Sequence, residues 1–118
     1  MEKLIALLFL SRDLAHRAHL KTTSYAQHVA LGDFYDEVID LADSLAEAYQ
    51  GRHGLLKDIP LLGAKPAANP AKLLRDHLDA IEAMRYTACN KEDTPIQNLI
   101  DEVCALYLQT LYKLDNLK

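Results

Sequence analysis

The stretch "HLKTTSYAQHVALGDFYDEVIDLADSLAEAYQG", residues 19–51, decides how this chain folds. From Ser24 to Gln50 its apolar residues recur at helical spacing, which predicts a long helix with one face in a hydrophobic core. The residues of that face are Leu31, Phe34, Tyr35, Val38, Ala42, Leu45 and Tyr49. The hydroxyl side chains of residues 22–24 can cap the first turn, and Gly51 is expected to end the helix.

Three further helices are predicted around this one. The first covers about residues 2–21, where leucine and alanine follow helical spacing. Each of the other two helices is predicted to start with a capping residue followed by proline, at Asn69-Pro70 and at Thr94-Pro95. The last helix reaches almost to the C-terminus. Glycine and proline in the connection 51–69 exclude a long helix there. We expect its apolar residues to pack on the body, with one short helical turn at most.

The predicted fold is therefore all-α, a four-helix bundle in a single domain over residues 1–118. Short first and third connections join antiparallel neighbours. The long connection permits a crossover between the second and third helices, which lets these two helices run parallel.

The composition is that of a soluble globular protein. The formal net charge is −4, and no run of lysine or arginine occurs, which argues against a nucleic-acid partner. The apolar run over residues 4–10 is too short to cross a membrane, and charged residues follow it where a signal peptide would have small ones. Cys89 and Cys104 have no metal-type or redox-type spacing and are interpreted as small buried side chains.

A row of polar residues borders the core face of the helix predicted at 24–50. Its members are His28, Asp36, Asp43 and Glu47. Asp43 and Glu47 lie four residues apart on one helix face, so their carboxylates repel each other unless a positive group lies between them. Carboxylates together with imidazole suit iron, zinc or manganese. The other interpretation is a solvated acidic border that only aids solubility.

A single chain cannot close such a site. His28 and Asp43 are fifteen residues apart, which is about 22 Å along a helix, whereas metal–ligand bonds are about 2 Å long. A shared ion therefore requires acids from a second chain. Antiparallel two-fold pairing of this helix would bring His28 of one copy beside Asp43 and Glu47 of the other, and the symmetry would create two equal sites.

The same residues carry a resemblance to a known family. The segment "HLKTTSYAQHVALGDFYD" resembles the Dps-like mini-ferritin branch of the ferritin-like superfamily, and within it the short ferritin-like proteins found in phages and bacteria. In that branch a histidine early in the second helix precedes an Asp-x-x-x-Glu pair by fifteen residues. Here His28 and "DSLAE", Asp43 to Glu47, match that spacing.

The resemblance implies a homo-oligomer that binds iron, or alternatively zinc or manganese, at two-fold interfaces. The implied ligands are His19, His28, Asp43 and Glu47, and the implied activity is oxidation and storage of Fe(II). His16 is a second candidate for the first ligand because it keeps the family's twelve-residue spacing to His28, and Asp36 is a further candidate. A cytoplasmic location follows, that of the host if a phage encodes the chain.

Several departures keep other interpretations open. Leu20 replaces the family's tryptophan, the basic tail of some members is absent, and the second half has no Glu-x-x-His pair. No catalytic residue beyond the metal ligands and no organic cofactor is expected. His53 and His77 have no partner pattern and are interpreted as structural or surface residues, and Tyr25 and Tyr35 as packing residues. The alternative function is a non-enzymatic helical interaction protein, for example a structural or accessory protein of a phage.

Overall fold

The computed structural model describes residues 1–66 and 68–118. Its helices are α1 (Glu2–Lys21), α2 (Tyr25–His53), α3 (Pro70–Ala88) and α4 (Thr94–Asn116). The described residues contain no strand, so the prediction of an all-α fold with four helices is confirmed. None of these helices is long and apolar enough to cross a membrane.

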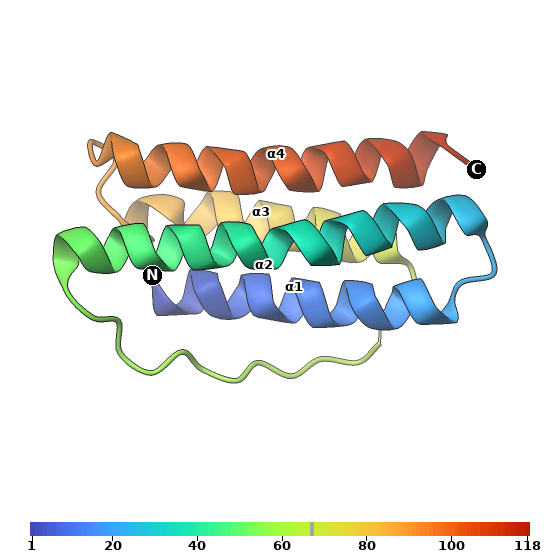
Figure 1. Cartoon of the computed structure of the whole chain (residues 1–118), viewed down its shortest axis with the longest axis horizontal. Coiled ribbons are helices and arrows are strands. Elements are labelled where there is room, and N and C mark those ends of the chain that lie inside the picture. Colours follow the sequence, from blue (N-terminus) through green and yellow to red (C-terminus); the bar gives the residue numbers. More distant parts are fainter. Residues whose placement is uncertain (67) are drawn as a thin grey trace.

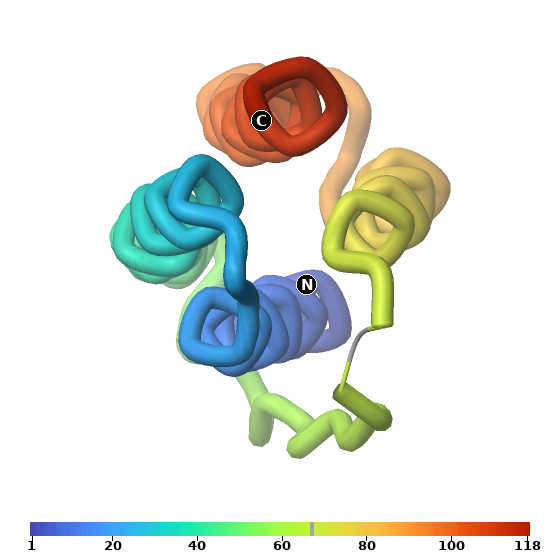
Figure 2. Tube along the Cα trace, turned by 90° about the vertical axis from the view of Figure 1, so that its right-hand side faces the viewer, coloured from blue at the N-terminus to red at the C-terminus, as the bar shows by residue number. Residues whose placement is uncertain are grey.

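The helices form a ring in which α1 contacts α2, α2 contacts α4, α4 contacts α3, and α3 contacts α1. Figure 2 shows this ring end-on, with the segment after α2 lying outside α1. That segment, residues 54–66, runs back along the bundle, so α2 and α3 point the same way (Figure 1). Each helix is consequently antiparallel to both of its neighbours, and the parallel helices lie diagonally opposite.

The core lies along the axis of this ring. Five members of the predicted α2 face are buried: Leu31, Phe34, Val38, Ala42 and Leu45. The two tyrosines of that face, Tyr35 and Tyr49, are only half-buried. The Phe34 ring meets the ring of Tyr107 from α4 edge-on, with the centroids 4.9 Å apart. The helical periodicity therefore predicted the buried face of α2, apart from the tyrosines at its margin.

The starts of α2 and α3 follow the prediction. Ser24 Oγ accepts a hydrogen bond from the backbone N–H of Gln27 at 3.2 Å, and Asn69 Oδ1 accepts one from Lys72 at 3.1 Å. Pro70 occupies the first turn of α3, where a missing N–H costs nothing. These capping bonds satisfy N–H groups that have no partner inside the helix.

Two predicted helix boundaries are wrong. Gly51 does not end α2, which continues to His53 and ends at Gly54, whose φ of 88° favours glycine. Thr94 is the first residue of α4 rather than its cap, because Asp93 occupies the capping position. The carboxylate of Asp93 makes no capping bond and instead contacts residues at the end of α2.

The connection after α2 packs on the body only in part. Leu56 and Ile59 pack against the core, whereas Leu55 and Leu61 are exposed. The backbone N–H of Lys57 donates to Glu2 Oε2 at 2.9 Å, which ties the connection to the start of α1. Residues 54–66 contain no helical turn, which agrees with the prediction of one short turn at most.

A buried polar chain joins three helices in the interior. The Tyr107 hydroxyl donates to Ser11 Oγ at 2.6 Å, and Ser11 pairs with His77 Nδ1 at 2.6 Å. Because the hydrogen on Ser11 is free to point at the ring, Nδ1 of a neutral His77 accepts this bond. Burial lowers the pKa of His77, which keeps the ring neutral. His77 is therefore a structural residue.

Candidate functional site

The first candidate site is at the turn between α1 and α2. His19 lies in the last turn of α1 and His28 in the first turn of α2, and their rings stack with the centroids 3.7 Å apart and the planes 17° apart. His16 stacks on Tyr35 at 4.1 Å, and Tyr35 meets His19 edge-on at 5.2 Å. We call these four residues, His16, His19, His28 and Tyr35, the histidine cluster.

Two reciprocal hydrogen bonds fix the stacked rings. His19 Nδ1 lies 2.6 Å from the carbonyl oxygen of His28, and His28 Nδ1 lies 2.8 Å from the carbonyl oxygen of His19. A carbonyl oxygen only accepts, so Nδ1 carries the proton in both rings. In the neutral rings Nε2 then keeps a lone pair, which is the arrangement that metal-ligating histidines commonly have.

Gly32 makes room for His19. A Cβ atom at this position would lie 3.0 Å from Cε1 and 3.2 Å from Nδ1 of the His19 ring, closer than most real Cβ contacts. Glycine inside a helix costs about 1 kcal/mol relative to alanine. Here the missing side chain allows the imidazole to approach the α2 backbone. The sequence prediction missed Gly32, although a glycine inside a helical pattern is a signal of close packing.

The predicted carboxylate ligands lie elsewhere on α2. Asp36, Asp43 and Glu47 are all exposed, and none of them forms an ion pair within the part of the chain that the structure describes. Among the described residues of one chain, no group of three donor atoms joins these histidines to these acids. The four-ligand set of His19, His28, Asp43 and Glu47 stays a prediction about two chains.

The stacking also limits how His19 and His28 can bind an ion. A metal lies close to the plane of an imidazole that ligates it, at about 2 Å from the nitrogen. Two nearly parallel rings 3.7 Å apart have no common in-plane point near both nitrogens. Joint ligation would thus require one ring to turn. His16 and His19 are less parallel, at 56° with the centroids 6.2 Å apart, so His16 stays a candidate for the first ligand.

A second cluster lies at the opposite end of α2. His53 Nε2 lies 3.0 Å from Asp93 Oδ2, and the Cys89 thiol lies 3.4 Å from the same oxygen. Among residues 1–66 and 68–118, these three form the one group that brings three potential metal-ligating atoms within 4.8 Å of one another. We call His53, Cys89 and Asp93 the Asp93 cluster.

Electrostatics hold Asp93 ionised. Burial by itself would raise the pKa of Asp93, but hydrogen bonds from His53 and Cys89 and the charge of Arg52 outweigh it, so the pKa is lowered. Arg52 Nε lies 3.1 Å from the other carboxylate oxygen, Oδ1. Burial, followed by the negative neighbour Asp93, raises the pKa of Cys89 and keeps it a thiol. Sequence reasoning missed this cluster because its members come from three different helix ends.

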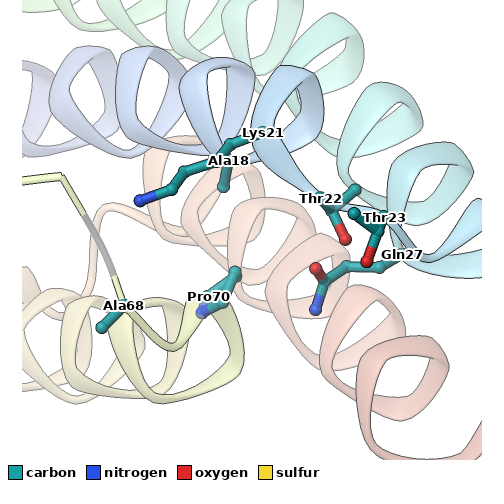
Figure 3. A pocket seen from close by; sticks show the side chains of 7 residues that line it. All are labelled: Ala18, Lys21, Thr22, Thr23, Gln27, Ala68 and Pro70. Carbon is teal, nitrogen blue, oxygen red and sulfur yellow. The ribbon is translucent and has the colours of Figure 1, made fainter.

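A surface hollow lies near the turn between α1 and α2. Figure 3 shows Thr22, Thr23 and Gln27 on one side of it, with Ala68 and Pro70 across from them. Its volume is about 260 Å³, which is below the range of roughly 300–1,000 Å³ that small-molecule sites usually have. No residue of the histidine cluster or the Asp93 cluster lines this hollow, and we assign it no function.

The fold and these clusters define an all-α bundle protein with metal-type donor groups at two separate places. The chain belongs to DUF5856, a family of unknown function, whose model matches residues 19–114. The matched range begins at His19 and includes both clusters except for His16. No curated protein and no solved structure matches the chain.

Proposed function

We propose that this protein is a ferritin-like bundle that binds a divalent metal ion between two copies of the chain. Iron is the first candidate, with zinc and manganese as alternatives. The donors are His19 and His28 of one copy and Asp43 and Glu47 of the other. His16 and Asp36 are alternative ligands. The observation that carries this proposal is the pair of ring-to-carbonyl bonds, because in the unbound chain they hold the proton on Nδ1 and leave Nε2 of both histidines with a lone pair for an ion.

The chain path supports the ferritin-like part of the proposal. Four-helix bundles of that kind have one long crossover connection, which lets the second and third helices run parallel. Residues 54–66 run along the outside of α1, and α2 and α3 point the same way, which supports a connection of this kind (Figures 1 and 2). Fold alone does not define function, so the metal must be argued from the donor groups.

The exposed acids supply the charge argument. Asp43 and Glu47 lie one helical turn apart without an ion pair to any described residue, so their negative charges are neighbours on one helix face and repel each other. A divalent cation held between two chains would remove this repulsion. The exposed neighbours of His28, Tyr25 and Val29, are 71% and 43% accessible and would be covered by the same subunit contact.

Binding requires a local rearrangement in this proposal. His28 is exposed, whereas His19 is half-buried and pressed against Gly32. His28 is therefore the ring that turns away from the stack, giving up its bond to the His19 carbonyl oxygen in exchange for the ion. Oxidation of Fe(II) by oxygen or peroxide and retention of the ferric product is the activity that follows, and the chain contributes the donors and their geometry.

The location follows from the cysteines and the iron. Cys89 and Cys104 are both free thiols, as is usual for proteins of a reducing compartment. We propose the cytoplasm, that of the host if a phage encodes the chain, because Fe(II) and free thiols persist there together.

A matched pair of double variants tests the proposal. Asp43→Asn with Glu47→Gln should lower the content of bound iron or zinc and weaken assembly, measured by elemental analysis and light scattering after purification without chelators. Glu37→Gln with Asp40→Asn changes the same charge at exposed positions of the same helix and should behave like the parent. Both pairs are made with Cys89→Ala, which removes the thiol of the Asp93 cluster. Equal metal content and assembly in the two double variants would contradict the proposal.

A second candidate function is a non-enzymatic interaction protein. Exposed apolar side chains on α4 favour it, because Leu108 and Tyr112 lie one turn apart and are 54% and 59% accessible. In this case assembly would persist without metal and would depend on this apolar surface. Loss of assembly in Leu108→Ser with Tyr112→Ser, together with unchanged assembly in the acid double variant, would favour the interaction protein.

A further inference from the structure

We propose that His53, Cys89 and Asp93 form a second metal site, complete within one chain, for a thiophilic divalent cation such as Zn²⁺. This inference does not depend on the subunit contact proposed above. The donors are an imidazole nitrogen, a thiolate sulfur and a carboxylate oxygen, the types that zinc takes in proteins. Three protein donors leave a fourth position for water or another small ligand.

The distances already approach those of a metal site. Tetrahedral bonds of about 2.0–2.3 Å place neighbouring donor atoms roughly 3.3–3.6 Å apart. Here Asp93 Oδ2 lies 3.0 Å from His53 Nε2 and 3.4 Å from Cys89 Sγ, and all three donor atoms lie within 4.8 Å of one another. Small side-chain movements would therefore suffice to enclose an ion.

The cation would take the place of the two hydrogens that His53 and Cys89 now donate to Asp93 Oδ2. At present Asp93 Oδ2 accepts from the Nε2–H of His53 and from the thiol of Cys89. On binding, the Cys89 proton leaves to solvent, and the neutral His53 ring carries its proton on Nδ1 instead of Nε2. The thiolate and the carboxylate then balance the two positive charges of the ion. Arg52 stays at the other oxygen of Asp93, so the carboxylate binds through Oδ2 alone.

The surroundings give the site both rigidity and an entrance. Cys89 is 6% accessible and the side chain of Asp93 is 8% accessible, whereas the side chain of His53 is 40% accessible. An ion would enter on the His53 side. The donors come from the last residue of α2, the residue that ends α3 and the residue before α4. A bound ion would therefore tie together three helix ends, which makes metal binding stabilise the folded chain.

The competing explanation is that these side chains only form hydrogen bonds that hold the helix ends together, and bind no metal. Cobalt titration separates the two, because Co²⁺ substitutes for Zn²⁺ and shows a thiolate-to-metal charge-transfer band only when sulfur binds. The intact protein, reduced and free of metal, should develop this band to a stoichiometry of one Co²⁺ per chain, and Zn²⁺ should abolish it. Cys89→Ala should lose the band entirely. His53→Gln should weaken Co²⁺ binding by more than about tenfold, because mutating even a residue that only hydrogen-bonds to a metal ligand lowers metal affinity by about that factor.

Two controls connect the result to this site. Cys104 is the other buried free cysteine, so Cys104→Ala should keep the band. The variant His28→Ala, Asp43→Asn, Glu47→Gln should also keep it, which separates this site from the proposed subunit site. Far-ultraviolet circular dichroism checks that each variant keeps its helices. Absence of the band in the parent, its survival in Cys89→Ala, or its loss in Cys104→Ala with the helices intact would overturn the proposal.

Discussion

The two ends of α2 carry histidines in contrasting settings. At its start, His19 and His28 lie nine residues apart across one turn and hold each other through backbone carbonyl oxygens. At its end, His53 meets a cysteine and an aspartate that come from the distant α3–α4 turn. Among the described residues, no carboxylate joins the imidazoles of the first end in a group of three donor atoms, whereas Asp93 lies at the centre of such a group at the second end. In our proposals the first end therefore takes its acidic donors from another chain, and the second end needs only one chain.

The largest stability effect is expected at the Asp93 cluster. Asp93→Asn removes the charge that Arg52, His53 and Cys89 surround, and it should lower the melting temperature at neutral pH. Because the folded-state pKa of Asp93 is lowered, its contribution is complete above the unfolded pKa of about 3.9 and fades as pH falls through the folded value. Thermal unfolding of parent and variant at pH 7 and at about pH 3 measures this.

An exposed ion pair provides the control for Asp93. Asp115 pairs with Arg75 at 2.8 Å, with both side chains about half accessible, at 45% and 53%. Such pairs contribute about 0.2–1 kcal/mol, so Asp115→Asn should change the melting temperature less than Asp93→Asn does. An equal drop in melting temperature in the two variants would show that the Asp93 cluster stabilises the fold no more than an ordinary surface ion pair does.

A smaller effect is expected from His77, which lies in the middle of α3. Burial lowers its pKa, and the neutral ring accepts from Ser11 in the chain that continues to Tyr107. The unfolded state therefore binds a proton more readily than the folded state, so stability should fall as pH drops below about 6.5, the ordinary histidine value. His77→Gln should remove this part of the pH dependence. Unfolding in urea between about pH 7.5 and 5.5 checks it, and an unchanged slope in the variant would contradict the hydrogen-bonded chain.

The smallest effect on stability is expected at the histidine cluster. Gly32→Ala gains up to about 1 kcal/mol of helix propensity, but the new methyl group would press on the His19 ring. The two contributions oppose each other, so the net change should stay within about 1 kcal/mol. The ring nitrogen and Cε1–H resonances of His19 and His28 should nevertheless shift, whereas those of His53 should not. Unshifted resonances at His19 would show that the ring does not touch Gly32 in solution.

These contrasts show what the sequence can predict. Ser24 and Asn69 act through neighbours within a few residues, so capping rules predicted them. The apolar face of α2 was predicted because its residues repeat at helical spacing within one segment. Gly51 and Thr94 obeyed the same local rules but gave wrong boundaries, because Gly54 offers a better terminus and Asp93 takes the capping position. Only at Asp93 do contacts with a distant part of the chain, the end of α2, accompany the difference.

The candidate sites divide in the same way. His19 and His28 lie on either side of one short turn between two helices, so their closeness could be expected from the sequence. The stacking and the space left by Gly32 depend on how α1 leans on α2, which no spacing rule describes. The whole α2–α3 connection and the whole of α3 separate His53 from Cys89, so only the packed bundle reveals the Asp93 cluster.

A crystal structure of the assembled protein grown with Fe(II) or Zn²⁺ tests the central claim most directly. We predict an anomalous-difference peak between two copies, at about 2 Å from Nε2 of His28 in one copy and from carboxylate oxygens of Asp43 and Glu47 in the other. We also predict that His28 has turned out of its stack on His19. An assembled state in which His28 and Asp43 of the second copy lie more than about 10 Å apart, far beyond any shared coordination sphere, would contradict the account.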